Sequence, residues 1–112
     1  MKVKTSTSPF GSRARTSVLL ALSLLEESYS RELARLLDLP VSGVQRALRS
    51  LESDGLIAAR SAGRTRLFRL DPRYFARAEL AALLSRLSEA EADLRRRVEA
   101  LRRRPRRSGK PL

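Results

Sequence analysis

Two amphipathic helices joined by a tight turn, over residues 32–51, constrain the fold of this chain more than any other stretch. In the first helix the inner face consists of Leu33, Ala34, Leu36 and Leu37. In the second, apolar residues follow the i, i+3, i+4, i+7 spacing that places side chains on one stripe, namely Val44, Ala47, Leu48 and Leu51. Pro40 stands in the turn, where it favours a new helix start. Both apolar faces therefore need a shared core.

The opposite face of the second helix carries polar and basic side chains: Ser42, Gln45, Arg46 and Arg49. Glutamine can read adenine in a DNA groove, and arginine can read guanine or hold a phosphate. This pattern favours a helix that enters the major groove of DNA. The alternative is a solvated helix face on a protein-interaction domain.

The composition of the chain limits what it can do. Its 112 residues suffice for one domain with one modest core. Cysteine and histidine are absent, which removes thiolate and imidazole metal sites, disulfides and the common nucleophile-base pairs. We therefore expect neither a cofactor nor enzymatic activity.

The formal charge of +12 is unevenly distributed. Residues 1–15 contain four basic residues and no acid, and residues 95–112 contain nine basic residues and one acid. Within the neutral middle, residues 41–70 hold six arginines against two acids. Basic surface thus falls on the second helix, the segment after it and both chain ends, as expected for a partner of double-stranded DNA.

The N-terminal part combines a basic segment with an apolar helix. Residues 1–12 are rich in Ser, Thr, Pro and Gly and are expected to form a flexible basic arm. The apolar run at 18–25 is too short for a membrane span and is followed by two glutamates, so we interpret it as a buried helix in a cytoplasmic, nucleoid-associated protein. We expect no membrane partner.

Extended segments follow the two helices. Residues 56–60 and 65–70 read as two strands joined by a turn with Gly63 near its tip. Arginines lie on or near this hairpin, at Arg60, Arg64 and Arg66. Such a hairpin beside a reading helix can lie along the DNA backbone or minor groove. Alternatively, the arginines only keep an exposed edge strand soluble.

The C-terminal part predicts one long helix. Asp71 and Pro72 form a helix start, and the pattern continues to about residue 104. Apolar residues form a heptad seam interrupted only by Glu91, namely Leu80, Leu84, Leu87, Leu94, Val98 and Leu101. We expect this seam to form a homodimer interface, with a helix folded back on the core as the alternative. Ser88 and Glu91 match a capping-box pattern, which leaves a kink or a new helix start open. Residues 105–112 form a basic tail.

Residues 13–70 resemble a winged helix-turn-helix domain of the ArsR/MarR-like regulators, and we expect the domain to span 13–72. The resemblance is carried by SRELARLLDLPVSGVQRALRSLESDGLI, followed by RSAGRTRLFRL. It implies a mainly α fold with a small β-hairpin wing, to which the heptad seam adds an extended C-terminal dimerisation helix over 73–104. It further implies that Ser42, Gly43, Gln45, Arg46 and Arg49 face the major groove, and that Arg60, Arg64 and Arg66 belong to the wing. No separate region for a small-molecule effector is evident.

These patterns together predict a homodimer that binds double-stranded DNA and regulates transcription. Two reading helices would enter successive major grooves of an inverted repeat, with half-sites about 10 bp apart. One alternative is an architectural protein that coats DNA regardless of sequence. Another is a winged-helix module that binds protein, with its arginines solvated.

Overall fold

The computed structural model describes residues 9–103 as five helices and one β-hairpin. In chain order the elements are α1 (Arg13–Leu25), α2 (Ser30–Leu37), α3 (Val41–Ser53), β1 (Ile57–Ala62), β2 (Thr65–Leu70), α4 (Arg77–Ser88) and α5 (Ala92–Arg102). This confirms the prediction of a mainly α fold with a small hairpin. Most of the predicted arm and the whole tail at 105–112 lie outside the described residues.

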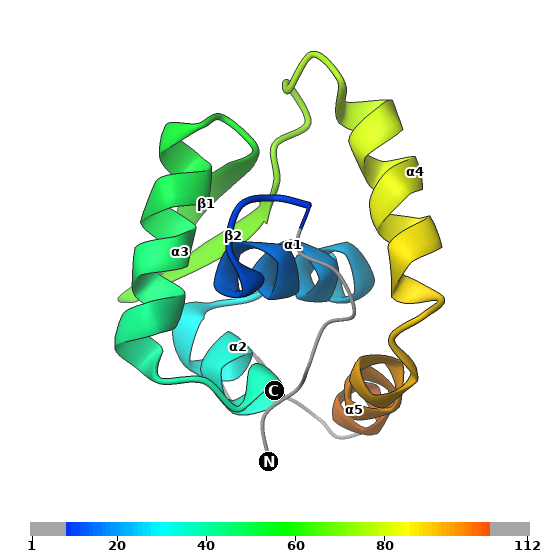
Figure 1. Cartoon of the computed structure of the whole chain (residues 1–112). Coiled ribbons are helices and arrows are strands. Elements are labelled where there is room, and N and C mark those ends of the chain that lie inside the picture. The colour runs from blue at the N-terminus through cyan, green and yellow to red at the C-terminus, as the bar shows by residue number, and fades with distance from the viewer. Residues whose placement is uncertain (1–8, 104–112) are drawn as a thin grey trace.

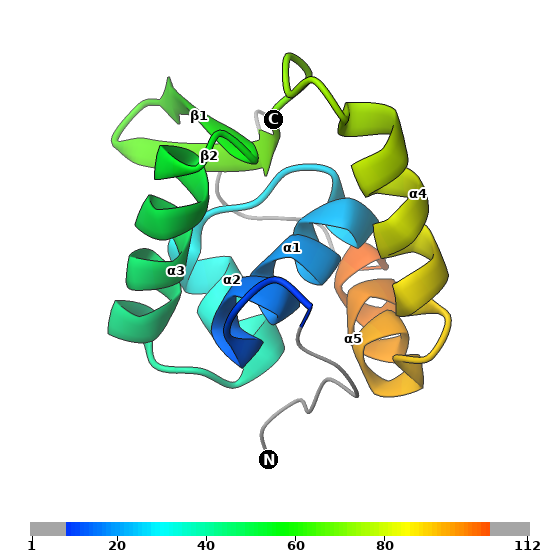
Figure 2. The same ribbon diagram turned by 45° about the horizontal axis from the view of Figure 1, so that its top comes forward.

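Helix α1 is the centre of the molecule. It lies between α3 and α4, and the other helices and the hairpin surround it (Figure 1, Figure 2). Consecutive residues from Val18 to Leu22 are fully buried, which explains why the run is apolar all round instead of amphipathic. Ser12 caps the helix, since its side chain accepts a hydrogen bond from the Arg15 backbone N–H. No helix within residues 9–103 has the length and apolar character needed to cross a membrane.

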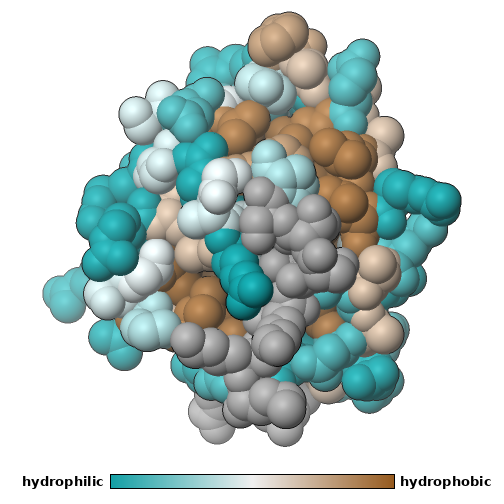
Figure 3. Space-filling view, in the orientation of Figure 1, coloured by the Kyte–Doolittle hydropathy of each residue, from teal (hydrophilic) through white to brown (hydrophobic). Residues whose placement is uncertain are grey.

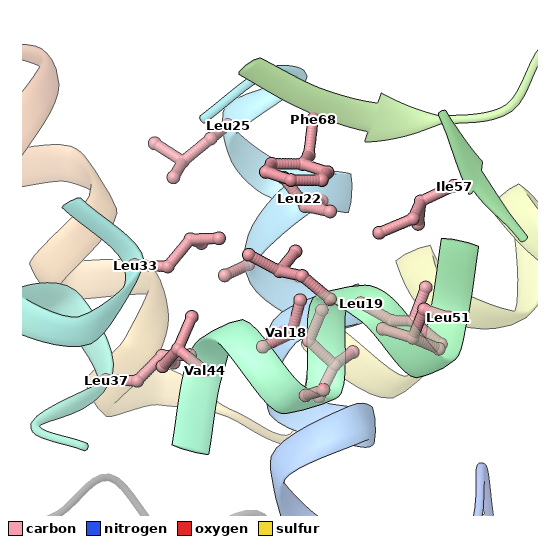
Figure 4. Close-up of a cluster of buried hydrophobic side chains, with 14 of the residues drawn as sticks. Val18, Leu19, Leu22, Leu25, Leu33, Leu37, Val44, Leu51, Ile57 and Phe68 are labelled. Carbon is pink, nitrogen blue, oxygen red and sulfur yellow. The ribbon is translucent and has the colours of Figure 1, made fainter. Parts of the chain in front are cut away.

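The predicted pair of helices is present as α2 and α3. Leu33 and Leu37 from α2 meet Val44 and Leu51 from α3 around Leu19 of α1, and all five side chains are fully buried (Figure 4). Asp38 ends α2 in the left-handed conformation, with φ of 57°. Tyr29 is the N-cap residue of α2, and its side chain makes no capping hydrogen bond.

The hairpin is anchored to the core by its inner face. Strands β1 and β2 are antiparallel, and Ile57 and Phe68 are buried beneath them (Figure 4). Ser28, between α1 and α2, adds a short third pairing: its backbone exchanges hydrogen bonds of 2.7 and 3.0 Å with that of Phe68. Gly63 makes the tight turn with φ of +64°. The base of the hairpin is therefore fixed on both sides.

The predicted helix start at Asp71 and Pro72 is wrong. The Asp71 side chain accepts a 2.8 Å hydrogen bond from the Arg73 backbone N–H, and its carbonyl accepts another from Tyr74. These two bonds form a turn at Asp71, which takes the place of the helix start that the sequence pattern predicts. Helix α4 begins only at Arg77.

The single long helix predicted over 73–104 is also wrong. The chain leaves α4 after Ser88 and starts α5 at Ala92. The Ser88 hydroxyl donates a 2.8 Å hydrogen bond to the carbonyl of Ser85, so it does not cap the next helix as a capping box would. Glu91 stands at the N-cap of α5 and is 5% exposed. Of the two interpretations left open, a new helix start is the one observed.

This break lets the apolar seam cover the chain's own core. In Figures 1 and 2, α4 and α5 both pack around α1 instead of extending into solvent. Four seam residues are buried in the core, and two are partly buried against it: Leu80, Leu84, Leu94 and Val98, then Leu87 and Leu101. The folded-back arrangement that the sequence left as the alternative therefore buries or partly buries all six residues within one chain.

Candidate nucleic-acid interface

A basic groove lies where α2, α3 and the hairpin meet. Its volume is about 560 Å³. We call it the α2–α3–wing groove, and it is lined by Tyr29, Ser30, Arg31, Arg35, Gln45, Leu48, Arg49, Arg64, Thr65, Arg66 and Phe68. Five of these are arginines, and none of the described lining residues is acidic. The groove therefore concentrates positive charge and hydrogen-bond donors on one concave surface.

The solvent-facing side of α3 contributes one wall of this groove. Ser42, Gln45, Arg46 and Arg49 are exposed, while Val44 and the other apolar residues of α3 face the core. Within residues 9–103, no hydrogen bond or ion pair engages the side chain of Arg46 or Arg49. Hydrophilic side chains also gather over α3 at the left edge of Figure 3, whereas hydrophobic surface is concentrated between α1 and α4. The helix therefore offers unengaged polar groups to a partner.

The first turn of α3 contains a glycine with open space around it. Gly43 is in the first turn, and a Cβ atom built on it would meet nothing within 4 Å. Glycine inside a helix lowers stability by about 1 kcal/mol relative to alanine. Because an added methyl group would meet nothing, packing within the described chain does not require glycine at this position. Val41, at the first helical position, is 37% exposed. Both features leave room for a partner to approach the helix backbone closely.

The wing arginines leave the hairpin on two different faces. The strand register pairs Ser61 with Arg66 and Arg60 with Leu67. Side chains of directly paired residues share a face, and faces alternate along a strand. Arg66 therefore shares the face of Phe68, where its guanidinium lies 5.4 Å from the ring centroid, and lines the groove. Arg60 emerges on the opposite face and is absent from the groove lining.

Arg60 is engaged by a carboxylate of the same chain. Its Nε and Nη2 donate hydrogen bonds of 2.8 and 2.9 Å to the two carboxylate oxygens of Glu27. The hydrogen bond and the negative charge of Glu27 raise the pKa of Arg60 above its ordinary value. The pair joins the outer face of the hairpin to the segment between α1 and α2. This contact indicates a role in holding the wing.

The two remaining wing arginines differ in their engagement. Arg66 makes a 3.1 Å ion pair with Glu52 at the end of α3, with the Arg66 side chain 58% exposed. Arg64 follows Gly63 at the hairpin tip and is exposed. No ion pair or hydrogen bond in the described part of the chain involves Arg64. Of the three arginines predicted for the wing, Arg64 is therefore the one most available to a phosphate.

Helix α2 adds groove residues that the sequence analysis missed. Arg31 and Arg35 are both exposed and line the groove together with Tyr29 and Ser30. Their spacing of four residues, which places them on one helix face, is the signal that could have identified them. The predicted residues that do line the groove are Gln45, Arg49, Arg64 and Arg66. Ser42, Gly43 and Arg46 lie on α3 outside the groove lining.

Within residues 9–103, no group of three or more acidic, histidine or cysteine side chains is placed to hold a metal ion. The segment from Phe10 to Arg15 has a structural role: Ser12 caps α1, and the Arg15 guanidinium donates to the Phe10 carbonyl at 2.7 Å and pairs with Asp54 at 2.9 Å. Arg15 thereby joins α1 to the end of α3.

Comparison with solved structures identifies the fold. The chain is similar to the adhesin competence repressor AdcR of Streptococcus pyogenes, with a TM-score of 0.60 and 17% identity over 80% of this chain. It is also similar to two variants of ZitR from Lactococcus lactis: a singly and a doubly substituted form each give a TM-score of 0.57 over 90% of this chain, at 18% and 17% identity. The aligned region spans 66% of the AdcR chain and 69% of each ZitR chain. Neither a family model nor a curated protein sequence matches this chain. The fold is a winged helix.

Proposed function

We propose that this winged-helix chain binds double-stranded DNA sequence-specifically as a homodimer and regulates transcription as a repressor or autoregulator. The observation that carries the proposal is the α2–α3–wing groove, where five arginines and Gln45 from three elements share one concave, acid-free lining. A regulatory role is supported by the similarity in fold to AdcR, which is named a repressor. Such a regulator would act on the nucleoid in the cytoplasm.

In this proposal α3 enters the major groove and reads base edges. Gln45, Arg46 and Arg49 are the base-contacting candidates, because their side chains are exposed and point away from the core. Ser42 and Gly43 lie at the helix start, where the backbone can approach the DNA. Val41 is exposed beside them and could contact a thymine methyl group.

The residues around α3 would hold the DNA backbone. Arg31 and Arg35 come to the groove from α2, and Arg64 and Arg66 come to it from the hairpin. A phosphate must compete with Glu52 for Arg66 and with Glu27 for Arg60. Arg64 faces no such competition within the described chain and should contribute more than Arg60 or Arg66. A homodimer would place two such surfaces on an inverted repeat, with half-sites about 10 bp apart.

An architectural protein that binds DNA of any sequence is the second candidate. Its support is that arginines dominate the groove lining, and every one of them could serve phosphates alone. In that case Gln45 would be dispensable. Substitution of Gln45 therefore separates the two candidates.

Salt-dependent binding of a labelled random duplex tests the shared part of the proposal. The affinity of the full chain should fall steeply with salt, and Arg35→Ala and Arg64→Ala should each reduce the slope of log K against log salt by about 1, because both residues are placed at the DNA backbone. Arg95→Ala, on the exposed surface of α5, is the matched control and should leave the slope unchanged. Equal slopes for all three variants would contradict DNA contact through the groove.

A further inference from the structure

The outward side of α4 carries apolar side chains that the rest of the described chain leaves exposed. Phe75, just before the helix, is 92% exposed, and Leu83 within it is 44% exposed. Ala82 is exposed beside Leu83. Single apolar residues are common on surfaces, but two of these lie within α4 and the third lies two residues before it.

Two charged residues flank this apolar centre. Glu79 and Arg86 are exposed and lie seven residues apart, so they share a face of α4 with the residues between them at positions 82 and 83. Along the helix the face reads acid, apolar pair, base. A surface with this order is complementary to itself when it is turned end to end.

The positions are symmetric about the midpoint between Ala82 and Leu83. A two-fold axis at this point would place Glu79 of one chain opposite Arg86 of a second copy, and Arg86 opposite Glu79. The same axis would bring Phe75 level with Ala90 of the second copy, which is exposed after α4. Both charged contacts and the apolar centre are therefore satisfied by one isologous arrangement.

We propose that this surface, the α4 face (Phe75, Glu79, Ala82, Leu83, Arg86 and Ala90), binds a second copy of the chain with the two α4 helices antiparallel. The inference rests on the proposed function in one respect: the proposed homodimer needs an interface, and the α4 face would supply it. The small Ala82 allows the helices to approach closely, while Leu83 and Phe75 supply the apolar contact. These residues differ from the buried heptad seam on the inner side of the same segment.

The arrangement leaves the DNA-binding candidate surface open. Helices α3 and α4 lie on opposite sides of α1 (Figure 1, Figure 2), so a partner on the α4 face does not cover the groove. Arg86 makes a 2.8 Å ion pair with Glu89 of its own chain, but both side chains are more than half exposed, at 81% and 55%. Exposed pairs of this kind stabilise little, so Arg86 can exchange partners on association.

Charge reversal tests the pairing of Glu79 with Arg86. Sedimentation equilibrium of the full chain should give a dimer for the wild type. Glu79→Arg or Arg86→Glu alone places like charges at both symmetric contacts and should weaken the dimer by about 10-fold or more. The double variant Glu79→Arg/Arg86→Glu restores complementarity and should return to within about 3-fold of the wild type. A double variant as weak as the singles, or singles with unchanged affinity, would overturn the pairing.

A second variant tests the apolar centre. Leu83→Asp should make the chain monomeric while its far-UV circular dichroism and thermal unfolding stay close to those of the control Arg95→Glu. A wild-type chain that is monomeric while still binding random duplex would overturn the inference and leave DNA binding intact. A dimer that responds to these variants but does not bind DNA would retain the inference and reject the proposed function.

Discussion

The hydroxyl of Ser28 donates a 2.6 Å hydrogen bond to the Glu32 carboxylate in the interior of the protein, where the two residues are 0% and 3% exposed. The backbone of Ser28 pairs at the same time with Phe68 in β2. One residue thus joins the first turn of α2 to the base of the wing. The relative placement of two walls of the groove depends on this junction.

Ser28→Ala should therefore destabilise the fold. The change removes a hydrogen bond from a buried carboxylate, and such losses cost about 1 to 3 kcal/mol. Urea denaturation followed by circular dichroism measures the free energy of unfolding. Ser30→Ala, at the nearby surface of α2, is the control and should change it by less than about 0.5 kcal/mol. Equal effects of the two variants would argue against a structural role for the Ser28–Glu32 bond.

The two faces of the wing should contribute unequally to DNA binding. Arg64→Ala should lower the affinity for duplex DNA more than Arg60→Ala does, because Arg60 is held by Glu27 and Arg64 has no partner in the described chain. Fluorescence anisotropy at one fixed salt concentration measures both. The prediction fails if Arg60→Ala has the larger effect. Glu27→Gln removes the carboxylate that holds Arg60. In that background, Arg60→Ala and Arg64→Ala should therefore have more similar effects on the affinity for DNA.

Gly43→Ala should separate stability from binding. Nothing in the chain obstructs the added methyl group, so the helix should gain up to about 1 kcal/mol of stability. If DNA approaches the start of α3 closely, the same methyl group should weaken binding. Thermal unfolding and anisotropy on the same preparation give the two results. A more stable variant with unchanged DNA affinity would show that the helix start stays clear of the DNA.

Neighbouring leucines of α4 should respond in opposite ways. Leu84 is fully buried, so Leu84→Ala should lower the free energy of unfolding by about 2 to 5 kcal/mol. Leu83 is 44% exposed, so Leu83→Ala should change it by less than about 1 kcal/mol at concentrations where the chain is monomeric. Chemical denaturation measures both. Similar losses would mean that α4 presents a different face to the core.

The sequence predicted the elements whose local pattern and packing agree. The periodicity at Leu33, Leu37, Val44 and Leu51 reflects burial against α1, and the bounds of α2 and α3 were recovered closely. Gly63 likewise located the hairpin, since a tight turn favours a residue that tolerates positive φ. Local preferences sufficed there because the tertiary structure reinforces them.

The C-terminal half was predicted less well, because a heptad pattern indicates which side chains are buried but not which part of the molecule buries them. Leu94 and Val98 continue the apolar spacing of Leu84 in the sequence. The helix nevertheless ends before Glu91, and a second helix places Leu94 and Val98 on the same core. Asp71 was predicted to start a helix, but it begins a turn, because its side chain accepts a hydrogen bond from the Arg73 backbone N–H. Likewise, sequence spacing grouped Arg60 with Arg66, while strand register separates them onto opposite faces. The seam and the wing arginines could be placed only once long-range contacts were known.

Selection of bound fragments from genomic DNA of the source organism, at about physiological salt, tests the central claim most directly. Specific complexes are typically ~10³ to 10⁷ tighter than non-specific ones, so a regulator should enrich a few sites that share an inverted repeat. Arg46→Ala and Gln45→Ala should then relax the base preference at defined positions, each at a cost of about 1 to 3 kcal/mol. Uniform recovery of all fragments, unchanged in these variants, would contradict sequence-specific reading by α3.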